Sequence, residues 1–190
     1  MQLYASVPSD DEVRAFLRNV ETSPFSYAEV GATRDSGRPS GYNVDHNCVE
    51  LGRGAEVWER AKAAIHGWKM FEHALTQIFW PNTPLVVGYS VGMLAHHLGF
   101  HSLSACRIVY VIDEPTRFGF AYGTLPAHAE TGEERFTVEW DRNTDIVTYD
   151  LYAFSRPRAP LAKLAAPYSR SLQRRFVKLS QAAMVKACEG

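Results

Sequence analysis

"CRIVYVIDEPTRFGFAYGTLPAHAETGEERFTVEWDRNTDIVTYDLYAF" (residues 106–154) holds four runs that are rich in β-branched and aromatic residues. Within these runs apolar and polar side chains tend to alternate, which is the period of a half-buried strand. Turn-forming segments at 113–115, 123–132 and 141–143 separate the runs by the short distances of hairpins. The stretch therefore predicts a mainly antiparallel meander of four strands.

Helical periodicity flanks this meander on both sides. Apolar residues recur with a period near 3.6 between residues 57 and 71, and again along a long C-terminal segment between residues 161 and 183. Pro160 begins that second helix, and Pro167 interrupts its first turns. Ser9, which three acids follow, predicts the N-cap of a short helix that runs to about Val20. Shorter strands are expected at 41–51 and 85–93.

A twisted sheet and a long amphipathic helix must bury their apolar faces together. We therefore expect an α+β fold in which a curved antiparallel sheet wraps around the C-terminal helix, the helix-grip arrangement. We expect residues 1–190 to form one such domain. A sheet that curls in this way often leaves an apolar cavity beside the helix.

The charge distribution limits the classes of partner. The net charge of −1 argues against a dedicated nucleic-acid binder, which would be strongly basic. Residues 156–190 nevertheless carry eight basic side chains against one acid, Glu189, so this segment is basic while the rest of the chain is acidic. The basic face is either the solvated side of the helix or a surface that docks peripherally on an anionic membrane or on an acidic partner.

The expected compartment is the cytoplasm. The three cysteines, Cys48, Cys106 and Cys188, are widely separated and form no CxxC pair, which suits reduced thiols better than a disulfide framework. The sequence shows no signal peptide and no apolar run near the ~18 residues of a membrane span. The pattern contains nothing that predicts an oligomeric state.

Four segments of the chain resemble the domain of unknown function 1990 family. They are SYAEVGATR (26–34), GYNVDHNCVELGRGAEVWERAKAAIHGWKMF (41–71), RFGFAYGTLPAHAETGEERFTVEW (117–140) and AFSRPRAP (153–160). More distantly, the pattern is similar to START-type lipid-transfer proteins, polyketide cyclases and pollen allergens. Members of that wider group hold hydrophobic ligands and some transform them, so the resemblance implies a START-like cavity for a polyketide- or lipid-like molecule.

The adjacent acids Glu133 and Glu134 must point to opposite faces of their strand. Phe136, Val138 and Trp140 form the expected core-facing set, and Glu134 shares their side. A carboxylate inside a cavity must be paired or have a raised pKa, so Glu134 is the better candidate for chemistry. The alternative is that the acids anchor the rim of the sheet through hydrogen bonds to loop amides or to Arg156.

The loop ahead of this strand supplies the other candidate catalytic groups. His128 titrates near neutral pH, and Tyr122 ends the preceding strand, so its hydroxyl is expected near His128. In this hypothesis Glu134 and His128 move protons while Tyr122 binds a carbonyl oxygen of the ligand. The residues expected to contact the ligand are mainly aromatic: Trp68, Phe71, Tyr89, Phe118, Phe120, Thr124, Phe136 and Tyr152.

Two further motifs are weighed and set aside. GYSVG (88–92) matches the hydrolase nucleophile elbow, but the strand pattern continues past Ser90, whereas an elbow needs a helix there. HHLGFH (96–101) places His97 and His101 four residues apart, as in some metal-binding helices. Because Gly99 lies between them and no HExxH glutamate is present, we expect histidines at a strand end and no metal site.

The sequence therefore favours a protein that binds a small hydrophobic or aromatic molecule in an internal cavity. The first hypothesis is a cofactor-independent enzyme of the cyclase or dehydratase kind, in which positioning and acid–base groups act on the ligand. The second is a non-catalytic carrier of a lipid or metabolite. The third is a structural interaction module whose core is filled. The substrate cannot be read from the residues.

Overall fold

The computed structural model describes residues 1–97, 99–158 and 166–189, and in this part of the chain eight strands form one antiparallel sheet. The strands are β1 (Gln2–Tyr4), β2 (Asn43–Arg53), β3 (Thr76–Phe79), β4 (Ser90–His96), β5 (His101–Glu114), β6 (Arg117–Thr124), β7 (Glu130–Asp141) and β8 (Ile146–Pro157). Seven are hydrogen-bonded in the order β2-β8-β7-β6-β5-β4-β3, and β1 pairs with the start of β5. The predicted meander is confirmed as β5 to β8.

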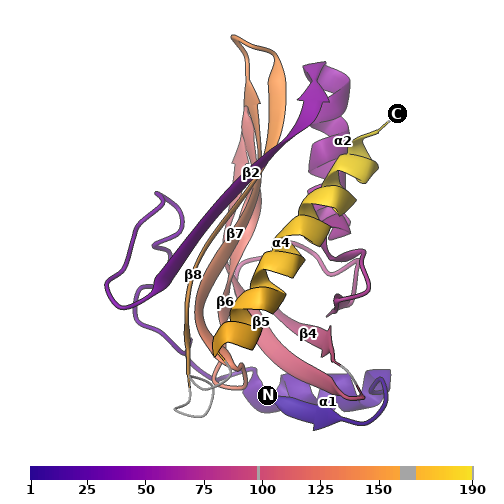
Figure 1. The fold of residues 1–190 in the computed structure, drawn as a ribbon, viewed down its shortest axis with the longest axis vertical. Coiled ribbons are helices and arrows are strands. Elements are labelled where there is room, and N and C mark those ends of the chain that lie inside the picture. Colours follow the sequence, from indigo (N-terminus) through magenta and orange to yellow (C-terminus); the bar gives the residue numbers. More distant parts are fainter. Residues whose placement is uncertain (98, 159–165, 190) are drawn as a thin grey trace.

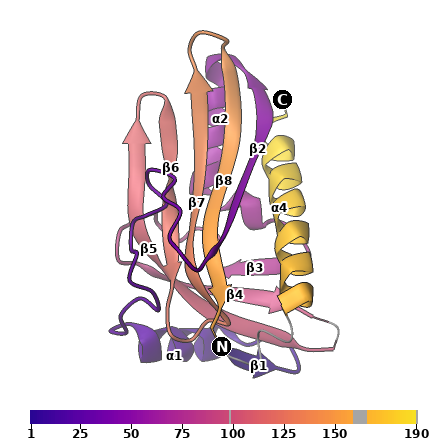
Figure 2. The ribbon, with the colours of Figure 1, turned by 60° about the vertical axis from the view of Figure 1, so that its left-hand side comes forward.

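The helices are α1 (Asp10–Val20), α2 (Gly54–His66) and α4 (Ala166–Cys188), with a 3₁₀ turn, η1 (Lys69–Phe71), after α2. Figures 1 and 2 show a curved sheet with α4 running along its concave side, α2 beside α4, and α1 at one end of the sheet. The fold is therefore the expected α+β helix-grip arrangement. No helix in the described ranges is both long and apolar enough to cross a membrane.

The ends of the helices follow local rules. Ser9 and Glu12 form a reciprocal capping box at the start of α1, because the Ser9 amide donates to Glu12 Oε2 (2.8 Å) and the Glu12 amide donates to Ser9 Oγ. Pro167 lies in the first turn of α4, where a helix needs no amide donor. The part of this helix pattern at 161–165, and Pro160 before it, lie outside the described residues.

The helix predicted between residues 57 and 71 is shorter than its apolar pattern. It ends at His66, and Trp68 takes a left-handed backbone conformation with φ of 53°. This turn buries the Trp68 ring, whose indole N–H donates to the Thr83 carbonyl at 2.8 Å. Tertiary burial of one aromatic ring therefore ends the helix before the periodicity does.

The strand predicted at 85–93 is also only partly correct. β4 begins at Ser90, and the side chains of Val86, Val87 and Tyr89 before it are exposed. Gly88 and Tyr89 exchange backbone hydrogen bonds with Ile108 of β5, but regular strand pairing with β5 begins only at Ser90, so alternation alone placed the start of the strand too early. Ser90 itself opens a strand, so the hydrolase elbow does not form there.

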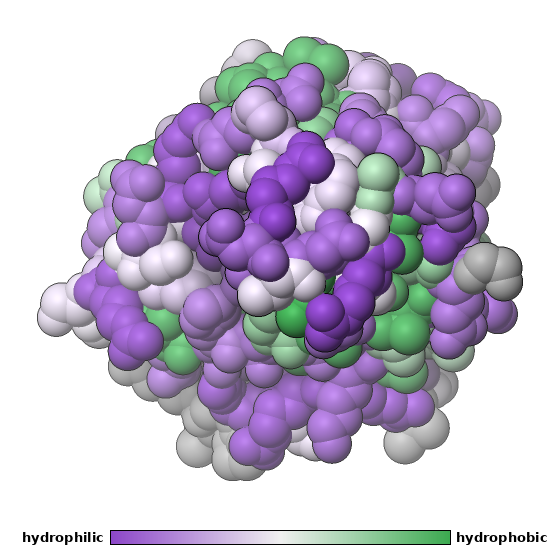
Figure 3. Space-filling model, turned by 90° about the horizontal axis from the view of Figure 1, so that it is seen from above, coloured by the Kyte–Doolittle hydropathy of each residue, from purple (hydrophilic) through white to green (hydrophobic). Residues whose placement is uncertain are grey.

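The main core lies between the concave face of the sheet, α2 and α4. Its largest fully buried members include Ile65, Trp68, Met70, Phe120 and Phe136. A second cluster packs α1 against β4 and β5. Seen from the end that carries α2 and the β7–β8 turn, the surface is mainly hydrophilic, with hydrophobic residues in separate patches (Figure 3).

Candidate functional site in the cavity between the sheet and α4

A cavity of about 1150 Å³ lies between the concave face of the sheet and α4. Its lining comes chiefly from β4, β5, β7, β8 and the N-terminal half of α4, and most of the lining surface is apolar. Phe100 and Tyr168 line it while 41% and 52% exposed, so they mark the side on which the cavity meets solvent. Many of the lining residues are polar, but little of the surface that they present to the cavity is, so the polar atoms that do reach it are informative.

Glu134 and Tyr122 form the central polar pair of the cavity wall. They lie opposite each other on β7 and β6, and the Tyr122 hydroxyl donates a hydrogen bond to Glu134 Oε2 at 2.7 Å. Burial raises the pKa of the Glu134 carboxyl to about 7, against the opposing effect of the Tyr122 hydrogen bond. Burial also raises the pKa of Tyr122 well above its usual value, so Tyr122 keeps its proton.

A second carboxylate, Asp45, stands on the same wall. The strand register places Asp45 of β2 beside Ala153 of β8, and Ala153 beside Glu134 of β7. Ala153 is small, so the two acids flank an open stretch of cavity wall, and the Asp45 charge adds to the raised pKa of Glu134. Arg170 of α4 binds Asp45, with Nη2 2.8 Å from Oδ1, and thereby joins the helix to the edge strand.

His128 lines the cavity as well, but as a neutral side chain. Its Nδ1 lies 3.0 Å from the Glu130 amide nitrogen and 3.1 Å from the Glu130 carbonyl oxygen, so it can accept from the amide in one tautomer or donate to the carbonyl in the other. Burial lowers the pKa of His128 to about 4. The expected pair between Tyr122 and His128 does not form, because the Tyr122 hydroxyl is bound to Glu134 instead.

Glu133 points to the convex face of the sheet, where it anchors the loop at 26–37. Its carboxylate accepts hydrogen bonds from the Tyr27 hydroxyl and the Gly31 amide, both at 2.7 Å, and from the Thr33 amide at 3.0 Å. Each of the two roles considered for these acids, a structural anchor and a carboxylate inside the cavity, is therefore taken by one of them. Glu133 anchors a loop through its amides, and Glu134 faces the cavity.

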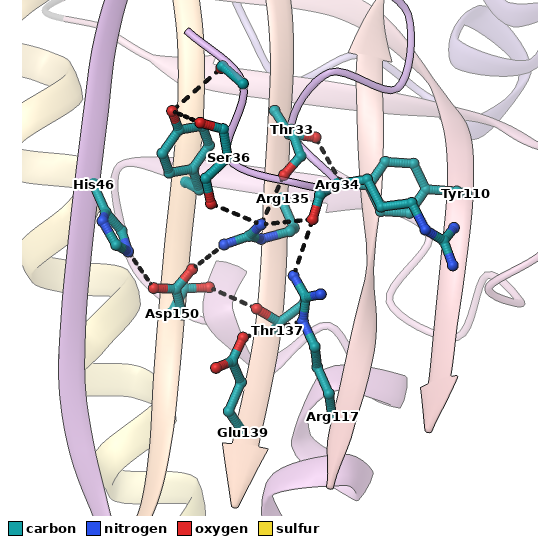
Figure 4. A network of polar contacts seen from close by, with 12 residues as sticks. Thr33, Arg34, Ser36, His46, Tyr110, Arg117, Arg135, Thr137, Glu139 and Asp150 are labelled. Atoms are coloured by element: carbon teal, nitrogen blue, oxygen red, sulfur yellow. Dashed lines mark hydrogen bonds and ion pairs between the residues drawn. The ribbon is translucent and has the colours of Figure 1, made fainter. Parts of the chain in front are cut away.

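The convex face carries a polar network beyond Glu133 (Figure 4). Arg135 donates from Nη1 to the Thr33 carbonyl at 2.7 Å and from Nη2 to Asp150 Oδ1 at 2.6 Å. His46 binds the other oxygen of Asp150. Tyr110 adds a hydroxyl contact to Thr33 at 2.6 Å. This network ties the loop to the four strands β2, β5, β7 and β8 and stands on the opposite side of the sheet from the cavity.

The residues expected to contact a ligand are divided by the structure. Thr124 lines the cavity, as does Tyr122. Tyr152 does not, because its ring lies on the convex face and its hydroxyl donates to the Ser36 carbonyl at 2.9 Å. Tyr89 is 49% exposed on the loop before β4 and also lies outside the lining. These two placements correct the expectation for both tyrosines.

The remaining aromatic candidates share the concave face but pack within the core below the helices. Trp68 lies 4.6 Å from Phe120 and Phe71 lies 5.7 Å from Phe136, as ring centroids. They fill space under α2 and α4, so they support the cavity and are not part of its lining. The residues in this position are Trp68, Phe71, Phe118, Phe120 and Phe136.

The histidines of the HHLGFH motif meet at the β4–β5 hairpin, as their strand-end placement predicts. Nδ1 of His96 lies 2.9 Å from Nδ1 of His101, and His97 Nε2 lies 2.8 Å from the Ser102 hydroxyl. His96 and His97 line the cavity. No group of three side chains suited to a metal ion occurs within the described residues.

Sequence reasoning missed Asp45 and Arg170. Asp45 shares one face of β2 with Asn43 and Asn47, and a polar set of this kind indicates a solvent face, so the local pattern gave no signal that Asp45 lines the cavity. Arg170 was counted only as part of a basic helix face. The ion pair between them joins positions 125 residues apart, and a local pattern does not encode such a pairing.

Solved structures share this fold at low sequence identity. A hypothetical protein from Helicobacter pylori aligns with a TM-score of 0.53 and 12% identity, over 88% of this chain and 98% of its own. The di-domain ARO/CYC BexL from the BE-7585A biosynthetic pathway aligns with a TM-score of 0.53 and 14% identity, over 80% of this chain and 52% of its own. At these identities the likeness establishes the fold alone.

Relatives in sequence are much closer. A UPF0548 protein of Deinococcus radiodurans is 38% identical, over 95% of this chain and 96% of its own length. A UPF0548 protein of Dictyostelium discoideum is 34% identical, over 95% and 93%. The family model described as "Domain of unknown function (DUF1990)" matches residues 26–183, so the resemblance read from the sequence is confirmed and this chain belongs to the DUF1990 family.

Proposed function

We propose that this protein binds a small hydrophobic or aromatic molecule in the cavity and acts on it as a cofactor-independent enzyme of the cyclase or dehydratase kind. The cavity of about 1150 Å³ with its largely apolar lining suits such a ligand. A filled-core interaction module has no need of this space. The fold shared with an ARO/CYC protein agrees with the proposal as an analogy only.

The single observation that carries the catalytic part is the Glu134–Tyr122 pair on the cavity wall. With a pKa of about 7, Glu134 exists in both protonation states near neutral pH. It can therefore take a proton from a bound ligand and return it at another position, which is what cyclisation with loss of water requires. Tyr122 fixes one oxygen of the carboxyl at 2.7 Å and leaves the other available to the ligand.

His128 has a different part in this proposal. Its pKa of about 4 makes it a poor base at neutral pH, so in this proposal the neutral ring takes the tautomer in which Nδ1 accepts from the Glu130 amide and Nε2–H donates to the ligand. A ligand carbonyl or hydroxyl oxygen that accepts this hydrogen bond would be held at the cavity wall. The negative charge that develops on that oxygen during proton transfer is stabilised by the same bond.

The experiment identifies the natural ligand first, by native mass spectrometry of the purified protein, and then follows its conversion. Glu134→Gln is expected to lower kcat by at least about 100-fold, the usual size of a general acid–base contribution, while the Kd changes little. His128→Ala should reduce kcat less. Glu130→Gln, which removes another carboxyl of the cavity lining, is the matched control. Turnover that is unchanged in both Glu134→Gln and His128→Ala would refute the proposal that the protein is an enzyme acting through these residues.

A carrier is the second candidate, and the basic residues of α4 favour it. Arg174 and Lys178, one helical turn apart, both line the cavity and are exposed. They would face the headgroups if the cavity opened toward an anionic membrane. Transfer of a fluorescent lipid from phosphatidylserine vesicles should then fall at high salt and in Arg174→Gln/Lys178→Gln, and stay unchanged in Glu134→Gln. Transfer that is insensitive to salt would exclude this docking surface.

A further inference from the structure

A second, smaller pocket of about 260 Å³ adjoins the cavity. It is lined by residues around η1 and β3, among them Trp68, Phe71, His73, Thr76 and His96. Thr76 and His96 also line the large cavity, so these two side chains form the boundary between the two spaces. A molecule in the cavity therefore lies next to the small pocket.

Two polar atoms at this pocket are buried and have no partner. Within the described part of the chain, neither Nε2 of His73 nor Oγ1 of Thr76 makes a hydrogen bond. More than about 90% of buried polar groups in proteins are satisfied, so two unsatisfied groups that line one pocket need a physical reason. A ligand atom that both groups can bind supplies such a reason.

The chemical character of His73 follows from its other ring nitrogen. Nδ1 faces the amides of Leu75 and Thr76 at 3.3 Å and 3.4 Å and accepts from them, so the proton of the neutral ring is on Nε2. Burial lowers the pKa of His73, which keeps the ring neutral. Nε2–H is then an unused hydrogen-bond donor. The ring also lies 5.4 Å from that of Phe176, a residue of the cavity lining.

We propose that this pocket is a subsite for a neutral oxygen-bearing group, a ketone or hydroxyl, at one end of the ligand whose body fills the cavity. The oxygen accepts from His73 Nε2–H, and the Thr76 hydroxyl makes a second hydrogen bond to it. A carboxylate is disfavoured because Glu72 also lines the pocket. This inference rests on the proposed binding function and does not depend on whether the protein is an enzyme.

The test compares three compounds of similar shape by calorimetry: 2-acetylnaphthalene, 2-ethylnaphthalene and 2-naphthoate. The wild-type protein is expected to bind the ketone roughly three- to tenfold more tightly than the hydrocarbon, the usual net effect of a buried hydrogen bond, and to bind the carboxylate no better. His73→Asn keeps an acceptor for the two amides and removes Nε2, and Thr76→Val keeps the shape. Each should reduce the preference for the ketone without weakening 2-ethylnaphthalene. His66→Asn, at an exposed histidine of α2, is the control.

The two failures are separable. If 2-ethylnaphthalene does not bind, the proposed hydrophobic cavity site is refuted. If it binds and the ketone has no advantage, or keeps its advantage in both variants, the subsite is refuted. Cyclopentanone, which is small enough for the pocket alone, tests the subsite directly by NMR. The Nε2–H signal of His73 should move on its addition, and an unmoved signal overturns the inference.

Discussion

Glu133 and Glu134 are neighbours in the chain with opposite surroundings. Glu133 is bound by two amides and a tyrosine hydroxyl, so its negative charge is well supplied with donors. Within the described residues, the Glu134 carboxyl accepts a hydrogen bond from one group, the Tyr122 hydroxyl, and it faces a mainly apolar cavity. Strand alternation decided which acid faces inward, and the loop on the convex face decided what the other acid does.

This contrast predicts that replacing Glu134 by Gln stabilises the folded protein, whereas replacing Glu133 by Gln destabilises it. The pKa of Glu134 is about 7 in the folded protein and 4.5 as its ordinary value, so between these pH values the folded state holds a proton that the unfolded state has lost. Folding stability therefore falls as the pH rises through this window. Glu134→Gln should remove that loss and be up to about 3 kcal/mol more stable than the wild type at pH 8, with little difference at pH 4.5.

Urea unfolding at the two pH values measures this difference. Glu133→Gln is the matched control, and it should destabilise the protein by about 1–3 kcal/mol because it weakens hydrogen bonds to a buried carboxylate. An effect of Glu134→Gln that is the same at both pH values would contradict the raised pKa.

The hydrogen bond from Tyr122 leads to a prediction for the pKa of Glu134. Its hydrogen bond stabilises the ionised form of Glu134 and so opposes the effect of burial. Tyr122→Phe should raise the pKa of Glu134 further, by roughly one unit, since a hydrogen bond to a charged group contributes about 1.5–3 kcal/mol. Carbon-13 NMR titration of the Glu134 carboxyl measures this shift. A pKa that stays at its wild-type value would mean that the bond is not made in solution.

At the scale of elements, α4 is held to the sheet by a buried pair of hydroxyl groups. Tyr149 of β8 and Ser180 of α4 lie 2.8 Å apart, and both are fully buried. Arg170 and Asp45 tie the same helix to β2 nearer the cavity. One side of the cavity thus depends on polar contacts between α4 and the two strands β8 and β2.

Ser180→Ala should therefore destabilise the protein by about 1–3 kcal/mol, because it leaves the Tyr149 hydroxyl buried without its partner. Tyr149→Phe combined with Ser180→Ala should cost less than the sum of the two single changes, and a double-mutant cycle of unfolding free energies measures the coupling. Ser171→Ala, at an exposed position of α4, is the control. Strict additivity would show that the pair contributes nothing.

The elements that the sequence predicted well are the long ones. β5 to β8 have 8 to 14 residues each and carry their own periodicity. β1 and β3, with 3 and 4 residues, were not predicted, because their strand conformation depends on pairing with β5 and β4. Trp68 shows the reverse case, in which core packing ended a helix that the pattern continued.

At the scale of the whole molecule, the cavity exists because small residues stand where larger ones would fill it. Ala153 lies between Asp45 and Glu134 on the wall. Ala153→Leu should place its added carbons in the cavity and weaken 2-ethylnaphthalene binding at least about tenfold, with stability changed by less than about 1.5 kcal/mol. Ala182→Leu, on the exposed side of α4, is the control for calorimetry and unfolding. Unchanged affinity in Ala153→Leu would place the ligand elsewhere.

The sequence by itself determined the curved antiparallel sheet, the helix along it and the inward direction of Glu134. These follow from periods of two and 3.6, which act over a few residues and orient side chains relative to their own element. Only the tertiary structure decided which side chains contact one another. Tyr122 meets Glu134 and not His128, Asp45 meets Arg170, Tyr152 turns to the convex face, and the loop at 26–37 covers Glu133. Such contacts join segments far apart in the chain, and a local pattern gives a side chain its direction but not what lies there.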